Sequence, residues 1–266
     1  MNSLPRLSGL QFVKFYYLLS GCFGLIYLQT AAAIAQPVSP PPNQVVAPAQ
    51  QISPLETVEP VMPVAPVPSP NPSNSPRSLP GQRPVVVIDP GHGGPDPGAV
   101  SIGGIYEKDI VLDISLQLAS LLETQGIQAI LTRQTDVDLG LQPRVAIANR
   151  ARAALFVSIH ANAISMDRPE VNGIETFHVA GSVEGEQLAA GIQQQLVSIT
   201  RMGDRGVKRA RFYVLVHTAM PAVLVEVGFV TGQEDALRLS DPATRTQMAQ
   251  AIGQGILGYL QRSDRQ

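Results

Sequence analysis

The stretch Pro84-Val85-Val86-Val87-Ile88-Asp89-Pro90-Gly91-His92-Gly93-Gly94 decides how the folded part of this 266-residue chain is built. Its run of apolar residues, closed by Asp-Pro-Gly, is typical of a strand that is buried on both faces of a sheet. The glycines that follow permit unusual backbone dihedrals and let the backbone approach a ligand closely. The stretch therefore predicts a central strand that leads into a glycine-rich turn carrying His92.

Beyond this strand at 85–88, apolar runs alternate with segments of helical spacing. Helices are expected at 110–122, 144–152, 187–199 and, as one or two elements, within 235–260. Further strands are expected at 128–132, 155–159, 173–179, 212–216 and 223–227. This alternation predicts an α/β fold, a single three-layer domain with a mostly parallel central sheet.

Three polar side chains stand at the ends of predicted strands. His92 lies just after the first strand, His160 directly follows the strand at 155–159, and Glu226 lies near the end of the strand at 223–227. Ligands of open α/β sheets bind beyond the carboxyl ends of the strands. The sequence therefore predicts that these side chains meet at one edge of the sheet.

A fourth polar residue, Glu107, lies where the helix at 110–122 begins. Taken singly, His92 could be an exposed turn residue, Glu107 a partner of the helix dipole, and His160 a core histidine with satisfied hydrogen bonds. Together, two histidines and a carboxylate, with water in the fourth position, form a catalytic zinc arrangement. We therefore predict that these three residues hold one Zn²⁺ per chain, although this donor set also suits other divalent ions.

Glu226 is the only charged residue in the apolar segment 221–229. Burying an unpaired carboxylate is costly, but it becomes tolerable beside a metal site. A zinc hydrolase needs a carboxylate that takes a proton from water and passes it to the leaving amine. Glu226 is therefore the predicted catalytic base, and a structural carboxylate that caps a loop is the alternative.

Composition narrows the classes of function. The formal net charge is −2, so the chain has no electrostatic basis for binding nucleic acid. Its one cysteine, Cys22, permits neither an intrachain disulfide nor a thiolate zinc site. Any metal must therefore be held by His, Asp or Glu.

Residues 1–35 are predicted to be a signal peptide. An apolar run follows Lys14 and closes with Ala33-Ile34-Ala35, a small-x-small cleavage pattern. The alternatives are a retained membrane anchor, because the run is about long enough to span a bilayer, and lipidation of Cys22. All three predict export to the periplasm or cell envelope, with membrane contact only if the segment is uncleaved or Cys22 is lipidated.

The next segment, residues 36–82, is rich in proline and predicted to be a disordered linker. Proline removes backbone donors and biases its predecessor toward extended forms, so no packed element is expected there. A segment that binds the wall or a partner is the alternative. Residues 83–262 are then the predicted catalytic domain.

Six motifs of the folded part resemble those of one enzyme family. In chain order they are Val87-Ile88-Asp89-Pro90-Gly91-His92-Gly93-Gly94, Glu107-Lys108-Asp109, Arg144-Val145-Ala146-Ile147-Ala148-Asn149, Ser158-Ile159-His160-Ala161-Asn162, Asp204-Arg205-Gly206-Val207-Lys208 and Leu224-Val225-Glu226-Val227-Gly228-Phe229. They are similar to those of the zinc-dependent N-acetylmuramoyl-L-alanine amidases of the third amidase type, over about residues 84–262. The resemblance implies a phosphorylase/hydrolase-like α/β domain.

The same resemblance implies site roles and a substrate. It gives zinc binding to His92, Glu107 and His160, and catalysis to Glu226. It implies hydrolysis of the amide between the lactyl group of N-acetylmuramic acid and L-alanine in peptidoglycan, for wall remodelling and daughter-cell separation. Some relatives carry an inserted helix that blocks the zinc site until a protein activator removes it. The short segment 163–172 predicts no such plug, and the need for an activator stays open. We expect a monomer.

The remaining histidines and acidic residues receive weaker predictions. Asp89 is expected to shape the turn and orient His92, because metal-bound histidine usually has an outer partner. Glu175 is a candidate for a residue that contacts the metal ligands without binding the metal itself. His178 is expected on the sheet surface, and His217 could line the cleft and touch substrate.

A small basic cluster consists of Arg205, Lys208 and Arg209. Its favoured interpretation is a solvated loop, and contact with carboxylates of the stem peptide is the alternative.

Three other functions stay open on the sequence alone. A zinc peptidase of other envelope peptides would use the same ligands and base, and only a digest of wall material separates it. A non-catalytic wall-binding module would be expected to lack a ligand or the base. A membrane-tethered scaffold would act through the linker at 36–82.

Overall fold

The computed structural model describes residues 83–263, so the predicted signal peptide and linker lie outside the described residues. Its elements, in chain order, are β1 (Val85–Pro90), α1 (Glu107–Thr124), β2 (Gln128–Leu131), α2 (Leu141–Arg150), β3 (Leu155–Asn162), β4 (Ile174–His178), α3 (Val183–Thr200), β5 (Asp204–Arg209), α4 (Tyr213–His217), β6 (Ala222–Phe229), α5 (Gln233–Ser240) and α6 (Pro242–Ser263). Among these helices, none combines the length and apolar character that crossing a bilayer requires.

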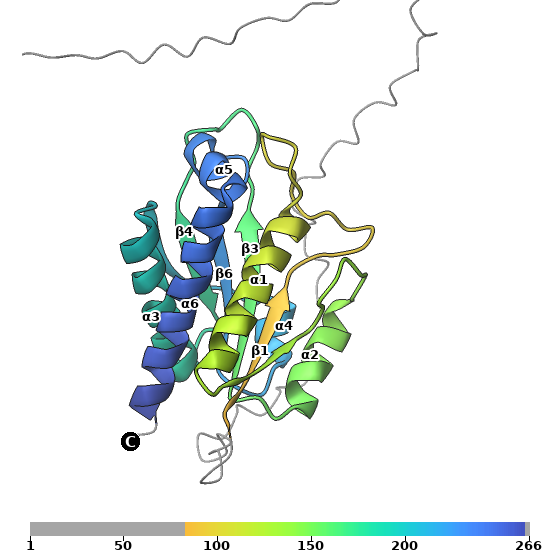
Figure 1. Ribbon diagram of the computed structural model, residues 1–266, viewed down its shortest axis with the longest axis vertical. Coiled ribbons are helices and arrows are strands. Elements are labelled where there is room, and N and C mark those ends of the chain that lie inside the picture. The colour runs from red at the N-terminus through yellow and green to blue at the C-terminus, as the bar shows by residue number, and fades with distance from the viewer. Residues whose placement is uncertain (1–82, 264–266) are drawn as a thin grey trace, which may run out of the picture. The chain divides into compact units, whose positions relative to one another are not determined.

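The described strands form one sheet in the order β2-β1-β3-β6-β4-β5. β2, β1, β3 and β6 run parallel to one another, whereas β4 pairs antiparallel with β6 and parallel with β5. The predicted α/β fold with a mostly parallel sheet is confirmed (Figure 1). Parallel strands joined through helices must be covered on both faces, which is why β1, β3 and β6 are almost continuously apolar.

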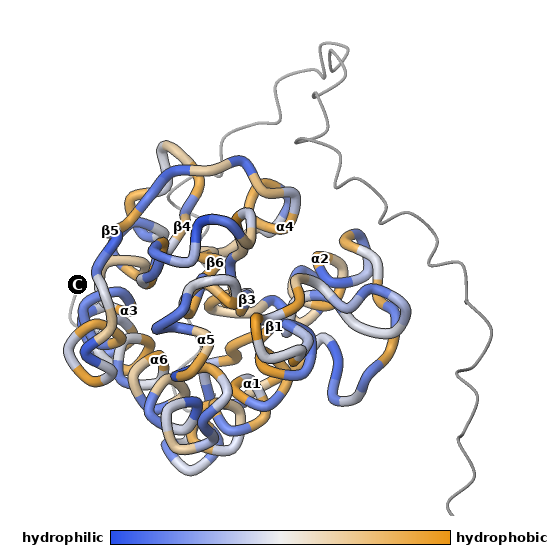
Figure 2. The backbone as a smooth tube through the Cα atoms, turned by 90° about the horizontal axis from the view of Figure 1, so that it is seen from above, coloured by the Kyte–Doolittle hydropathy of each residue, from blue (hydrophilic) through white to orange (hydrophobic). Residues whose placement is uncertain are grey.

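Successive residues of β1 supply two separate cores. Val86 and Ile88 pack with α1, α3 and α6 on one face of the sheet. Val87 packs with Val145 of α2 and Leu215 of α4 on the other face. Figure 2, viewed from above, shows these helix groups on opposite sides of the strands. The arrangement is the predicted three-layer domain, and it leaves the carboxyl ends of β1, β3 and β6 at one edge.

One strand expectation was wrong. The apolar run 212–216 was expected to be a strand, but residues Tyr213–His217 form helix α4. The amides of Leu215 and Val216 both donate to the carbonyl of Phe212 at 3.0 Å, as a helical turn requires. A short apolar run fits a buried strand or a buried helix equally well. Here both sides of β6 are already occupied by β3 and β4, so the run covers the sheet instead of joining it.

The expectation of a solvated loop at the basic cluster was also wrong. Asp204–Arg209 forms β5, which pairs with β4 at the edge of the sheet. Charged residues and Gly206 give this segment little strand propensity. Charged side chains are nonetheless typical of edge strands, because they discourage pairing with another chain.

Candidate active site

The first residue of the site, His92, lies in the turn that follows β1. Its φ angle is +58°, a left-handed conformation that costs energy for a residue with a side chain. Its Nδ1 lies 2.7 Å from Asp96 Oδ2. This contact leaves Nε2 as the ring nitrogen that can bind a metal.

Two buried arginines hold the turn in place. Arg144 donates to the carbonyl oxygens of Pro90 at 2.6 Å and His92 at 2.8 Å. Arg133 donates to those of Pro90 at 3.0 Å and Gly91 at 2.7 Å. These bonds satisfy consecutive backbone acceptors that the strand no longer pairs, so the strained turn is fixed by the protein around it.

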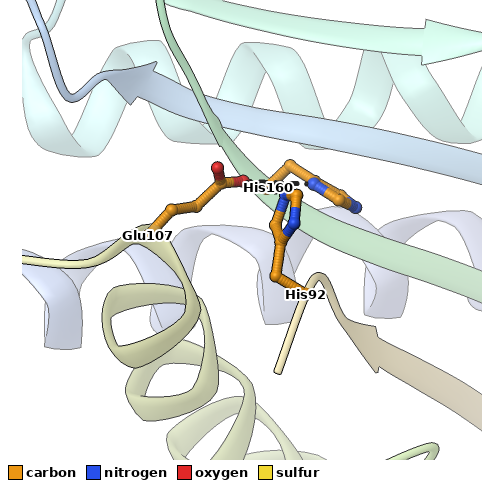
Figure 3. Close-up of side chains that lie close together, drawn as sticks. All are labelled: His92, Glu107 and His160. Atoms are coloured by element: carbon orange, nitrogen blue, oxygen red, sulfur yellow. Dashed lines mark hydrogen bonds and ion pairs between the residues drawn. The ribbon is translucent and has the colours of Figure 1, made fainter. Parts of the chain in front are cut away.

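Glu107 is the first residue of α1 and is buried, with 4% of its surface exposed. Its Oε2 accepts from the amide of Ala99 at 2.9 Å, and its Oε1 from the amide of Ala161 at 3.0 Å. His160 comes from β3, and its side chain is 21% exposed. A carboxylate at a helix start and a histidine near a strand end are thereby brought to the same place (Figure 3).

The three predicted ligands form a compact group. Glu107 Oε1 lies 3.1 Å from both His92 Nε2 and His160 Nδ1. The histidine rings stand edge to face at 77°, with centroids 5.0 Å apart. One donor atom from each residue lies within 4.8 Å of the other two, close enough to hold a single metal ion. The structure thus brings together His92, Glu107 and His160, as the sequence predicted.

The charges of this group are strongly coupled. Burial lowers the pKa of His92, but the hydrogen bonds and negative charges of Glu107 and Asp96 outweigh it and raise this pKa to about 9. Burial also disfavours the charged form of His160, yet Glu107 and the charge of Glu226 raise its pKa overall. The pKa of Glu107 is held far below its usual range despite burial, because both histidines bond to it. A metal bound here would displace protons from the imidazoles.

Glu226 lies beside this group. Its Cα is the register partner of His160 in the adjacent strand, so the two side chains point to the same face of the sheet. Its Oε2 is buried without a hydrogen-bond partner. Burial is the main cause that raises the pKa of Glu226, to about 7, partly offset by the nearby charge of His160. A carboxyl group that titrates near neutral pH can both accept and donate a proton.

Glu175 continues the row across β4. It is the register partner of Glu226 on the other side, and it is buried. Its Oε1 accepts from Lys208 Nζ at 2.6 Å and from Arg205 Nε at 2.5 Å, and its Oε2 lies 3.4 Å from Asn162 Nδ2. Glu175 contacts none of the three predicted ligands directly, but it joins the end of β3 to β5.

Three minor expectations need correction. Asp89 makes no hydrogen bond to the His92 side chain; its carboxylate accepts from Thr132, Arg144 and Ser158, so it supports the turn only through Arg144. His178 is buried within the sheet and is not a surface residue.

His217 ends α4, before β6 begins, and therefore lies at the edge opposite the site. Its ring stacks on Tyr213, with centroids 3.9 Å apart. It does not line the cleft.

Sequence reasoning missed Asp96 and the roles of Arg133 and Arg144. Asp96 stands four residues after His92, where a carboxylate partner for the imidazole could have been sought. The two arginines gave no local signal, because their partners are backbone carbonyls about 40 to 55 residues away.

The fold and the site together define the class: a hydrolase built on an α/β sheet, with a candidate metal-binding group at the carboxyl ends of its parallel strands. The family model for N-acetylmuramoyl-L-alanine amidase matches residues 86–258, and the chain belongs to this family.

Named relatives agree with this membership. The amidase LytC of Bacillus subtilis is 40% identical over 176 residues, which are 65% of this chain and 35% of LytC. The structure of the amidase AmiC2 of Nostoc punctiforme has 47% identity and a TM-score of 0.64, covering 67% of this chain and 97% of that one. The CwlD amidase of Clostridioides difficile, solved in complex with the GerS lipoprotein, has 32% identity and a TM-score of 0.64, covering 67% and 99%. The chain therefore spans about a third of LytC but nearly all of the two solved domains.

Proposed function

We propose that this protein is a zinc-dependent N-acetylmuramoyl-L-alanine amidase. It hydrolyses the amide between the lactyl group of N-acetylmuramic acid and L-alanine of the stem peptide in peptidoglycan. The observation that carries the proposal is the convergence of His92, Glu107 and His160 beside Glu226, whose Oε2 is buried without a partner. Family membership supports the substrate, and the site geometry supports the chemistry.

The residues present fit one zinc ion. Two imidazoles and one carboxylate are the donor set of catalytic zinc sites that keep a position open for water. His92 would bind through Nε2, since Asp96 occupies Nδ1, and His160 through Nδ1, the nitrogen that lies 3.1 Å from Glu107 Oε1. When bound, zinc would supply Lewis acidity that polarises the scissile carbonyl and acidifies a water.

The chain's own residues supply the proton transfers. Glu226 Oε2 accepts the proton of the attacking water and returns it to the amine of L-alanine as the amide bond breaks. In the metal-free protein burial raises the pKa of Glu226 to about 7, so both protonation states are accessible near neutral pH. The Asp96 carboxylate fixes the orientation of His92, and the amides of Ala99 and Ala161 fix that of Glu107.

A digest of purified peptidoglycan tests this function. The full chain is incubated with wall material, with and without chelator, beside a Glu226→Gln variant. Mass spectra should show free stem peptides that begin with L-alanine, and these should vanish with chelator and with the variant. Products cut within the stem would favour the peptidase alternative. A protein that binds metal but releases nothing would point to a missing activator or a different substrate. A protein that neither binds metal nor releases anything would favour the wall-binding alternative.

Localisation and partners form the rest of the proposal. A wall substrate requires export to the periplasm or cell envelope, with wall remodelling and daughter-cell separation as the cellular roles. β3 connects to β4 through residues 163–173 without a helix, and the His92 side chain is 25% exposed. We therefore propose that the catalytic domain acts without removal of an inhibitory helix at this connection. Activity of the purified full chain without any added protein is the test.

A further inference from the structure

We infer that Arg205 and Lys208 form a binding site for a carboxylate of the substrate's peptide portion. The inference rests on the proposed function and names how that site holds the peptide. It starts from a β-bulge where β5 pairs with β4. Ile174 pairs with Asp204 and Thr176 with Val207, so Glu175 faces two residues, Arg205 and Gly206.

The bulge re-aims one side chain. In a regular strand, residues three apart point to opposite faces of the sheet. The extra residue, Gly206 with a φ of +81°, places Arg205 on the same face as Lys208. Both cations therefore reach the same oxygen of Glu175. Bulges in general are frequent at sheet edges and beside active sites, where they redirect side chains.

The charges do not cancel. A single cation would neutralise the buried Glu175 carboxylate, whereas both Arg205 and Lys208 contact it, which leaves one positive charge in excess. The side chains of Arg205 and Lys208 are 38% and 39% exposed, so each keeps donors open to solvent. The Arg205 guanidinium also lies 5.0 Å above the ring of Phe229, at the end of β6. This contact holds the guanidinium at the carboxyl edge, where the other site residues lie.

The position suits a peptide chain that leaves the metal group. The row runs from His160 on β3 through Glu226 on β6 and Glu175 on β4 to the two cations on β5. Neighbouring strands lie about 4.8 Å apart, so β5 is about 10 Å from β6, which carries Glu226, and about 14 Å from β3, which carries His160. An extended peptide advances about 3.3 Å per residue and covers these distances in about three to four residues. The bound carboxylate thus belongs to one of the first residues after the cleaved amide.

The third basic residue of the strand provides a matched control. Arg209 pairs with His178, so its side chain points to the α3 face, where it lies 3.9 Å from Glu186. Replacing Arg209 removes one positive charge from the same strand without touching Glu175. Replacing Lys208 alone leaves Arg205 to neutralise Glu175, so the fold should be kept.

The test uses the zinc-loaded full chain and two synthetic substrates. One is an N-acetylmuramoyl tripeptide with free carboxylates, and the other is the same compound with its carboxylates amidated. Lys208→Met should raise KM for the free form about three- to tenfold, as expected for one charge-assisted contact at a half-exposed site. The value of kcat should hardly change, because the contact is made in both ground and transition states. Arg209→Met should leave both substrates unaffected.

Each outcome decides the matter. A loss confined to the free carboxylate, with unchanged melting temperature and zinc content, supports the site. Equal losses on both substrates, or none on either, overturn it while leaving the amidase activity in place. If the wild type cleaves neither compound, the proposed function fails, and this inference fails with it.

Discussion

Arg144 donates a hydrogen bond from Nη2 to the carbonyl oxygen of His92 at 2.8 Å, and the same guanidinium contacts the carbonyl of Pro90 and the carboxylate of Asp89. One buried side chain of α2 thus holds the backbone on which the first candidate ligand stands. A lysine has a single donor head and cannot make this set of bonds.

Replacing Arg144 by lysine should therefore weaken zinc binding about 10- to 100-fold, the usual effect of losing support behind a metal ligand. It should also lower the free energy of unfolding by about 2–4 kcal/mol, because buried acceptors lose their partners. Chelator competition and denaturant titration measure these effects. Arg150→Lys, on an exposed position of the same helix, is the control and should change neither quantity. Wild-type zinc affinity in Arg144→Lys would contradict the role.

Alanine substitutions at two glycines distinguish the effect of crowding at the metal site from the effect of backbone strain. Gly98 and Gly104 have similar φ angles, +64° and +80°, so alanine is strained at both. A Cβ at Gly98 would lie 2.6 Å from Glu107 Oε2 and 2.7 Å from His92 Cδ2, whereas one at Gly104 meets nothing within 4 Å. Backbone strain alone should cost each variant about 1–2 kcal/mol of stability, and the clash at Gly98 adds to this loss. Only Gly98→Ala should also lose zinc, as measured by metal content after dialysis. Equal zinc content in the two variants would show that the ligands tolerate the added methyl group.

The raised pKa of Glu226 predicts a pH-dependent stability of the metal-free protein. The folded state keeps this proton up to about pH 7, whereas the unfolded chain loses it near its ordinary value of 4.5. The wild type therefore loses stability as pH rises through this window. Glu226→Gln should be more stable than wild type by about 1–3 kcal/mol at pH 8, with a smaller gain at pH 5. Denaturant titration at the two pH values measures the difference.

Glu175→Gln is the matched control for that experiment. Arg205 and Lys208 hold the pKa of Glu175 below its usual range, although burial opposes them. Its charged form therefore contributes stability above the unfolded pKa, and this variant should be less stable than wild type at pH 8. A gain of stability in both variants would refute the sign of one of the two shifts.

Zinc affinity should rise with pH up to about 9. In the metal-free protein His92 has a pKa of about 9 and that of His160 is also raised, so zinc must displace protons at neutral pH. For each proton that zinc must displace, the apparent zinc affinity rises about tenfold per pH unit as long as the pH is below the pKa of that histidine. Chelator competition between pH 6.5 and 9.5 should show this slope. Asp96→Asn removes one charge that raises the His92 pKa, so its curve should level off at a lower pH. A flat wild-type curve between pH 7 and 9 would contradict the protonated histidines.

The sequence by itself determined the class of fold and the candidate ligands. The buried run 85–88 and the alternation after it indicated parallel strands, and parallel strands bring their carboxyl ends to one edge. This rule needs only the positions of the strands in the sequence and their parallel direction. It therefore placed His92, His160 and Glu226 together without knowledge of the packing. The motif resemblance added the family, which the match over residues 86–258 bears out.

Only the tertiary structure decided what surrounds those residues. Whether the run 212–216 became a strand or a helix depended on whether a place beside β6 was free. Arg144 and Arg133 hold the turn after β1 through its backbone carbonyls, which no side-chain pattern encodes. Arg205 and Lys208 can both donate to Glu175 only because of a bulge in the pairing of β4 and β5. Sequence periodicity describes which face a residue takes within its own element, whereas these contacts arise between elements.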